Sequence, residues 1–364
     1  MKIKEIISCI ESYAPVSFQE SYDNSGLITG DPAQEVKSAL LCIDVTEEVI
    51  NEAVKLHCGL IISHHPLVFR PIKKLTDDSW INRCLIKAIR EKIALYAAHT
   101  NIDSVKQGVN ARISEKIGLI NLEILAQRKD ELRKLVFFVP SSHAEKVRNK
   151  VFEAGAGHIG NYDQCSFNTL GEGTFRGSEN TNPFVGIRGE FHTEKEIRVE
   201  TIYPVFIESA VIKAMLEAHP YEEVAYDIYP LANLYTQAGS GMIGDLPHMV
   251  SETAFLKKLK LIFRTGTIRH SPLLRKKIKK VAVCGGSGGQ FLDQALRMGA
   301  DIYITSDIRY HQFFDADRKI IIADIGHYES EQFTTEIFHE LILKKFPKFA
   351  VHFSKVNTNP VNYY

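Results

Sequence analysis

Short, uninterrupted apolar runs alternate with amphipathic stretches along the first third of the 364-residue chain. The runs at residues 39–45, 60–63 and 93–98 lack the alternation of a half-exposed strand, so they predict strands that are covered on both faces. Between them, residues 47–56 and 80–91 carry apolar positions at helical spacing. This order of strands and helices predicts a layered α/β domain.

The last third of the chain has the same character. Apolar runs at residues 281–284, 301–305 and 319–323 predict further buried strands. Helical periodicity follows at residues 290–298 and 330–344. We therefore expect both ends of the chain to build one α/β core.

The middle of the chain is looser and richer in Gly, Asn and Thr. Its pattern predicts two β-α-β halves, which together suggest a ferredoxin-like sandwich. The expected fold is a layered α/β core domain, residues 1–125 plus 248–364, that is split by an inserted ferredoxin-like α+β domain at 126–247. The elements predicted within the insert are strands at 134–139, 162–170, 196–203 and 225–230, and helices at 144–154 and 206–217.

Composition narrows the functional classes. Lys plus Arg and Asp plus Glu both number 44, and the zero net charge disfavours a broad nucleic-acid-binding surface. The six cysteines include no C-x-x-C pair, which argues against a thiolate zinc site and fits a reducing compartment. No apolar run approaches the roughly 20 residues of a membrane span. We expect a cytoplasmic protein without a membrane segment.

Two adjacent histidines give the strongest chemical signal. His64 and His65 follow the predicted strand at 60–63, at the carboxyl end where open α/β sheets form their sites. Successive strand residues point to opposite faces, so the pair can reach two ions or enclose one. The alternative is one surface histidine and one hydrogen-bonded histidine.

A second candidate run follows the strand at 93–98. His99 offers an imidazole that can bind a metal or move protons, and Asp103 offers a carboxylate. Taken alone, Asp103 is better explained as a helix cap, because a helix is predicted at 108–117.

Two further pairs have the four-residue spacing that places side chains on one helix face. His327 and Glu331 follow the strand at 319–323, and the alternative for them is an acidic first helical turn. Asp307 and His311 are candidates for a general acid/base pair or for groups around the metal. A helix cap beside a surface histidine explains that second pair nearly as well.

These runs are expected to meet at one edge of a single sheet. Their imidazoles and carboxylates suit zinc, iron or manganese without selecting among them. Five ligands exceed what one catalytic zinc needs, so two ions about 3.5–4 Å apart use them better. The glycine-rich run at 285–289 either presents N–H groups to an anion or lets the backbone approach this site.

Several motifs in a fixed order are similar to the NIF-three-like family, the homologues of GTP cyclohydrolase I type 2. The resemblance implies that two divalent metal ions per subunit are bound through His64, His65, Asp103, His327 and Glu331. It also implies a homohexamer built as a trimer of dimers, with the middle segment as a PII/CutA-like insertion. The motifs are DNSGL at 23–27, SHHP at 63–66, HTNID at 99–103, GGSGG at 285–289, DIYITSDIRYH at 301–311, GHYESE at 326–331 and NTNP at 357–360.

Two functions follow from this set of residues. The first is a metal-dependent hydrolase whose dinuclear site activates water, converting GTP and water to 7,8-dihydroneopterin triphosphate and formate. In that case His99, His311 or Asp307 would move protons. The second is a metal-dependent regulatory or scaffold protein, a metal chaperone or transcription partner, without cyclohydrolase activity.

Overall fold

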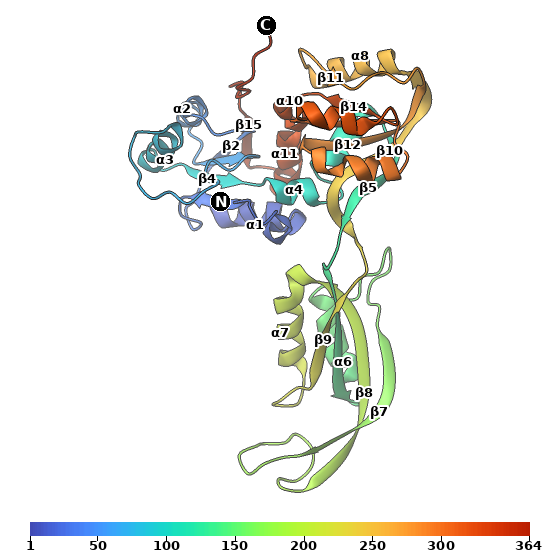
Figure 1. Cartoon of the computed structure of the whole chain (residues 1–364). Coiled ribbons are helices and arrows are strands. Elements are labelled where there is room, and N and C mark those ends of the chain that lie inside the picture. The colour runs from blue at the N-terminus through green and yellow to red at the C-terminus, as the bar shows by residue number, and fades with distance from the viewer. The chain divides into compact units, whose positions relative to one another are not determined.

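The computed structural model describes residues 1–364, which divide into two compact units (Figure 1). The first unit joins residues 1–127 to residues 236–364, and the second is residues 128–235. Residues 236–247, expected in the insert, continue strand β10 (Tyr235–Ser251) of a sheet that belongs to the first unit. None of the helices combines the length and the apolar composition that crossing a bilayer requires.

A five-stranded sheet carries the first third of the chain in the order β1-β4-β3-β2-β15. Its central strands are parallel and fully buried because they lie under helices on both faces. The antiparallel β1 covers one edge, and β15 brings the C-terminal segment to the other. The strands are β1 (Gly26–Thr29), β2 (Ser38–Cys42), β3 (Leu60–Ser63), β4 (Ala94–Ala97) and β15 (Ala350–Phe353).

A six-stranded sheet carries the last third in the order β11-β14-β13-β12-β10-β5. Strands β12, β13 and β14 are parallel, and β11 is an antiparallel edge. The three predicted strands of this region are confirmed. The other two strands, β5 and β10, carry the chain to and from the second unit. The strands are β5 (Ile120–Arg128), β11 (Arg269–His270), β12 (Lys277–Ser287), β13 (Ile302–Ser306) and β14 (Ile321–Asp324), together with β10.

The helices of the first unit pack on both sheets. Helices α2 and α3 pack on one face of the five-stranded sheet. Helix α11, which belongs to the last third of the chain, also contacts strand β2 of this sheet. Helices α5, α8 and α10 contact β12 of the other sheet, and a contact between α5 and α11 joins the two groups. The helices are α1 (Ile3–Tyr13), α2 (Glu47–Lys55), α3 (Trp80–Arg90), α4 (Thr100–Ser104), α5 (Val109–Ile117), α8 (Glu252–Phe263), α9 (Leu292–Arg297), α10 (His327–Glu331) and α11 (Thr334–Lys345).

The two sheets of the first unit share an arrangement that the sequence did not reveal. Each contains three successive parallel strands beside an antiparallel edge, as β1-β4-β3-β2 in one sheet and β11-β14-β13-β12 in the other. The third parallel strand of each set leads to a short helix, α4 after β4 and α10 after β14. The helix predicted at 330–344 is found as α11 from Thr334 to Lys345, and the first two residues of the predicted range belong instead to α10, which ends at Glu331.

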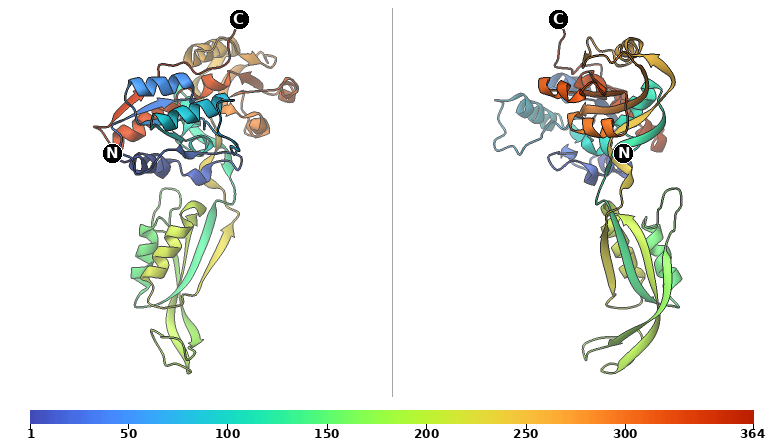
Figure 2. Two further views of the ribbon diagram at one scale, coloured as in Figure 1. Left: turned by 90° about the vertical axis from the view of Figure 1, so that its left-hand side faces the viewer. Right: turned by 45° about the vertical axis from the view of Figure 1, so that its right-hand side comes forward.

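The second unit is a four-stranded sheet with two helices, in the order β7-β8-β6-β9. Helices α6 and α7 lie side by side on one face, where their apolar residues pack on inward-facing positions of β6 and β8 (Figures 1 and 2). All strand pairs in this sheet are antiparallel. The elements are β6 (Leu132–Pro140), α6 (Ala144–Glu153), β7 (Phe167–Arg176), β8 (Phe191–Pro204), α7 (Glu208–Ala218) and β9 (Tyr226–Leu231).

A buried carboxylate holds the segment that enters β12. Glu252, at the start of α8, accepts hydrogen bonds from the backbone N–H groups of Leu274, Arg275 and Lys276 at 2.8–3.1 Å. Glu252→Ala leaves these donors without their acceptor, so we expect the free energy of unfolding to fall by about 2 kcal/mol. Thermal unfolding measures the change, with the exposed Glu91→Ala as control. Equal melting temperatures for the two variants would contradict the prediction.

Candidate metal centre

His64 and His65 lie at the carboxyl end of β3, where the chain leaves the five-stranded sheet. Their backbone N–H groups still bond to the carbonyls of Cys42 and Ile43, at 3.2 and 2.9 Å, so the strand pairing continues through both residues. The side chain of His64 is completely buried, and that of His65 is partly exposed. The backbone of both ligand candidates is therefore fixed by the sheet.

Glu331, the last residue of α10, brings a buried carboxylate to these imidazoles. Its Oε2 atom lies 2.9 Å from His65 Nε2, 3.1 Å from His327 Nε2 and 3.5 Å from His64 Nε2. Asp103 Oδ1 lies 3.7 Å from His64 Nε2. Three overlapping sets of donor atoms lie within 4.8 Å of one another: His64, His65 and His99; His65, His327 and Glu331; and His64, Asp103 and Glu331.

All four imidazoles of this cluster are held in the same way. In each ring the Nδ1 atom bonds to an oxygen outside the cluster, which leaves Nε2 as the atom that can bind a metal. Three of the four oxygens are carboxylates, and such partners also raise the basicity of a histidine ligand. The pairs are His64 with the Ala98 carbonyl at 3.0 Å, His65 with Asp44 at 2.7 Å, His99 with Asp23 at 2.8 Å and His327 with Asp307 at 2.6 Å.

The donor atoms fit a divalent cation. His64 Nε2 and Asp103 Oδ1 are buried and have no hydrogen-bond partner within the chain. Burying such atoms unsatisfied is costly, and neither Asp103 nor Glu331 forms an ion pair with a lysine or arginine. A cation among them would satisfy both requirements. Imidazole and carboxylate donors suit zinc, iron or manganese.

The charges of the cluster shift its protonation. Burial and the charge of Glu331 raise the pKa of Asp103 to about 8. Burial tends to raise the pKa of Glu331, but His64 and His327 outweigh it and hold this pKa well below its usual range. Burial tends to lower the pKa values of His65 and His327, but the neighbouring carboxylates outweigh it and raise them to about 9 and about 11, respectively. Without a metal, His65 and His327 therefore keep their protons and balance the charge of Glu331, while Asp103 is itself protonated near neutral pH.

The glycine-rich segment at 285–289 supports this cluster. Gly286 has φ +62°, and a Cβ there would lie 2.2 Å from Glu331 Oε1. Residues 285–287 are part of β12 rather than a free turn. Three of the five N–H groups of the segment have side-chain acceptors within the chain, namely Asn110 for Gly285 at 2.8 Å, Ser330 for Gly286 at 2.9 Å and Thr305 for Gly288 at 3.0 Å. These three donors are therefore not free for an anion.

The expectation that the candidate residues share the edge of one sheet is wrong. His64, His65, His99 and Asp103 follow strands of the five-stranded sheet, whereas His327 and Glu331 follow β14 of the six-stranded sheet. The carboxyl ends of the two sheets therefore supply the cluster jointly. His99 and Asp103 occupy the same place after β4 as His327 and Glu331 occupy after β14, each pair four residues apart.

Asp307 and His311 do not form the expected pair on one helix face. Asp307 directly follows β13 with a left-handed backbone (φ +56°), and its carboxylate bonds to His327 instead. His311 lies on the 3-10 helix from Tyr310 to Ala316, exposed and packed between the rings of Tyr310 and Phe314. The donor sets of the cluster do not include His311.

The sequence reasoning missed the residues that orient the histidines. Asp44 directly follows β2, at the same sheet edge as His65, so the rule that found His65 would also have found it. Thr358 of the C-terminal NTNP motif donates to the second oxygen of Asp44 at 2.8 Å. Asp23, the first residue of the DNSGL motif, accepts hydrogen bonds from both His99 and Thr100.

Comparison with known proteins agrees with this architecture. The model of the Duf34/NIF3 (NGG1p interacting factor 3) family matches residues 1–360. The chain belongs to this family. The resemblance drawn from the sequence motifs is thereby confirmed.

Relatives in the Duf34/NIF3 family match along the whole chain. A Halalkalibacterium halodurans protein called GTP cyclohydrolase 1 type 2 homolog is 40% identical over 363 residues, which cover 98% of both chains. A Bacillus subtilis protein of the same name is 36% identical over 365 residues, covering 99% of this chain and 98% of its own. The crystal structure of a Bacillus cereus protein related to NIF3 is 40% identical, with a TM-score of 0.86 over 100% of this chain and 99% of that one.

Removing an orienting carboxylate tests the role of the outer hydrogen bonds. Asp44→Asn keeps the shape of the side chain but removes the charge that holds His65 Nδ1. We expect the affinity for Zn²⁺ to fall by about 10- to 100-fold. Titration against a competing chelator measures it, and Asp315→Asn, at an exposed position, is the matched control. Equal affinities would show that Asp44 does not act through His65.

Gly286→Ala tests the close approach of β12 to Glu331. The added Cβ meets Glu331 Oε1 and requires a strained backbone, so the carboxylate must move. We expect lower metal content after purification, measured by mass spectrometry of the metal. Gly299→Ala is the control, because Gly299 also has a positive φ but has nothing within 4 Å of the added Cβ. Full metal content in Gly286→Ala would contradict the arrangement.

Metal binding should displace protons from the cluster. The raised pKa values of Asp103, His65 and His327 mean that all three groups are protonated near pH 7 in the metal-free protein. We expect the release of about three protons per chain when Zn²⁺ fills the cluster, and an affinity that rises from about pH 6 to about pH 9. Calorimetry in buffers of different ionisation enthalpy measures both quantities. An affinity independent of pH would contradict this charge balance.

Proposed function

We propose that this protein is a metal-dependent hydrolase whose centre binds two divalent ions, zinc, iron or manganese. The observation that carries the proposal is the common arrangement of four imidazoles, each held at Nδ1, of which His64, His65 and His327 place Nε2 within 3.5 Å of the buried Glu331 carboxylate. Structural histidines have no need of such uniform outer partners, whereas metal ligands commonly have them.

Two ions fit the donor sets better than one. The set of His64, Asp103 and Glu331 and the set of His65, His327 and Glu331 share only the Glu331 carboxylate. Each set supplies three ligands to one ion, and Glu331 then contributes to both. Three protein ligands leave a position open for water or substrate. Ions in such a pair lower the pKa of bound water and stabilise charge on the reacting oxygens.

His99 is suited to proton transfer beside these ligands. Its Nδ1 is held by Asp23, and it belongs to a donor set with His64 and His65. Burial tends to raise the pKa of Asp23, but hydrogen bonds from His99 and Thr100 outweigh it and hold this pKa well below its usual range. The carboxylate therefore stays ionised. The pair then keeps His99 in one orientation while its Nε2 exchanges a proton with substrate or water. Asp307 acts as a positioning residue for His327.

We propose GTP as the first substrate to test, on the support of the two relatives called GTP cyclohydrolase 1 type 2 homolog. In that reaction one water adds at C8 of the purine and opens the imidazole ring, and a second water releases formate from the resulting formamide. The ribose carbons then close the dihydropterin ring with loss of one water, so that one water is consumed overall. The protein loaded with Zn²⁺, Mn²⁺ or Fe²⁺ is incubated with GTP, and formate and the pterin product are measured. We expect metal-dependent formate release that falls at least about 100-fold in His64→Ala and Asp103→Ala.

The control for this experiment is Asp315→Asn, which should retain full activity. If no metal supports formate release, the cyclohydrolase proposal falls. Metal-dependent cleavage of phosphate esters or anhydrides, screened in the same samples, would then preserve the hydrolase class. Absence of every hydrolytic activity in the loaded protein would contradict the hydrolase proposal as a whole.

A metal-dependent regulatory or scaffold role is the second candidate. It is supported by the family description, which names an interacting factor of NGG1p. A variant that loses turnover but keeps its metal distinguishes the two roles, because a scaffold retains its cellular function in that case. His99→Gln is the informative variant, because His99 is proposed to transfer protons and does not belong to the two donor sets that contain Glu331. If cells that carry the catalytically inactive His99→Gln variant keep the full cellular function of the protein, the scaffold role is favoured.

We also propose that residues 128–235 are a ferredoxin-like inserted domain. The support is the order β-α-β-β-α-β together with the strand order β7-β8-β6-β9, in which the first and third strands of the unit are central. Self-association as a homohexamer remains a proposal from the resemblance, and light scattering of the purified protein tests it.

A further inference from the structure

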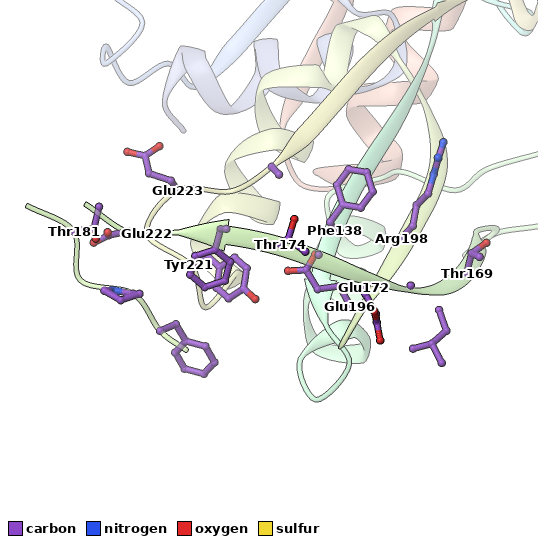
Figure 3. Close-up of a pocket in the computed structure, with 18 residues that line it drawn as sticks. Phe138, Thr169, Glu172, Thr174, Thr181, Glu196, Arg198, Tyr221, Glu222 and Glu223 are labelled. Atoms are coloured by element: carbon purple, nitrogen blue, oxygen red, sulfur yellow. The ribbon is translucent and has the colours of Figure 1, made fainter. Parts of the chain in front are cut away.

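A cavity of about 550 Å³ lies within residues 128–235 and is not used by the proposed chemistry (Figure 3). It lies on the face of the sheet opposite the helices, because Phe138, Glu196 and Arg198 alternate with the inward-facing Phe137, Ile197 and Val199. The loops at 177–184 and 221–225 complete its wall. Its volume is in the range of small-molecule sites.

Glu196 is the decisive residue of this cavity. It is 8% exposed, and no lysine, arginine or histidine forms an ion pair with it. Gly173 on the neighbouring strand makes room for it, because a Cβ at that position would lie 2.1 Å from Glu196 Oε2. A buried carboxylate without a cation is costly to the fold. The cost is offset when a ligand brings the positive charge.

Aromatic rings form the apolar part of the wall. The ring of Tyr221 lies 6.2 Å from that of Phe175 and 6.3 Å from that of Phe184, and Phe138 also lines the cavity. The Tyr221 hydroxyl is buried and lies against the Glu196 carboxylate, and burial together with this neighbour raises the pKa of Tyr221. Aromatic faces attract organic cations, most strongly where water is excluded. Rings beside an unpaired carboxylate therefore favour an ammonium group on an apolar body.

Two other ligand classes fit the cavity poorly. The carboxylates that line it do not form a group of three converging donors, so they do not build a metal site. Its single arginine, Arg198, already pairs with Glu200 at 3.0 Å, which leaves no free cation for a phosphate or carboxylate ligand. Exposed Glu172, Glu222 and Glu223 add further negative charge around the opening.

We propose that this cavity binds a small organic ammonium ion, with its charge against Glu196 and its apolar body against Tyr221 and the neighbouring phenylalanines. The inserted unit then senses or stores an amine, and its ligand differs in charge from the nucleotide proposed for the metal centre. The inference stands apart from the hydrolase proposal, because no residue of the cavity belongs to the metal cluster.

The test compares three probes of similar shape and different charge. Phenethylamine, 2-phenylethanol and phenylacetate are titrated into the full-length protein without added metal, and binding is measured by calorimetry and by NMR shifts of the Tyr221 and Glu196 amides. We expect phenethylamine to bind at least about tenfold more tightly than the alcohol, the difference that one charge-assisted contact supplies. Phenylacetate should bind more weakly still.

Variants assign the binding to the named residues. Glu196→Gln keeps the shape of the side chain, and we expect it to weaken phenethylamine binding about tenfold and to remove the preference over the alcohol. Glu145→Gln, at an exposed position on α6 and so on the other face of the sheet, is the matched control. Without ligand, Glu196→Gln should melt at or above the wild-type temperature, because it removes an unpaired buried charge.

A second variant keeps the proposal testable if Glu196→Gln does not fold. Tyr221→Leu preserves apolar volume but removes the aromatic face, and should also reduce the preference for the amine. Equal binding of the three probes, no binding of phenethylamine at millimolar concentration, or unchanged binding in both variants would overturn the proposal. Phenethylamine binding should persist in His64→Ala, so failure at the metal centre and failure at this cavity are distinguishable.

Discussion

Two buried carboxylates and four imidazoles face one small space, and neither Asp103 nor Glu331 has a lysine or arginine to balance it. The rest of the core serves this constraint. Each histidine is fixed by an oxygen behind it, and Gly286 lacks the side chain that would displace Glu331. Burial strengthens the electrostatic interactions among these groups, and their donor atoms are close enough together to hold a metal ion.

The arrangement of two similar sheets explains how a small cluster receives so many ligands. Each half of the core contributes a short helix after its third parallel strand, and each helix region carries a histidine and a carboxylate four residues apart. One sheet alone supplies a partial set. The second half closes the site, and the C-terminal segment secures it through the hydrogen bond from Thr358 to Asp44. This joint construction accounts for a discontinuous core whose two ends must fold together.

The inserted unit has a chemistry of its own. Its sheet buries one face under α6 and α7 and leaves the other for a cavity in which Glu196 lacks a cationic partner. In the metal cluster, histidines kept protonated can balance buried carboxylates, but the cavity around Glu196 contains no such compensating group. The two sites therefore solve the same physical problem, a buried negative charge, with different expected ligands.

The sequence by itself determined most of the local structure and the kinds of ligand. Continuous apolar runs identified β3, β4, β13 and β14, and the histidines after them signalled a site, because parallel strands place such residues at their carboxyl ends. It did not determine that two sheets share the cluster, since strand periodicity contains no information about which strands pair. Only the tertiary structure showed that Asp307 holds His327 rather than pairing with His311, and that Asp44 and Asp23 orient other rings. Such partners are separated by up to 76 residues in the chain, and long-range packing alone brings them within hydrogen-bond distance.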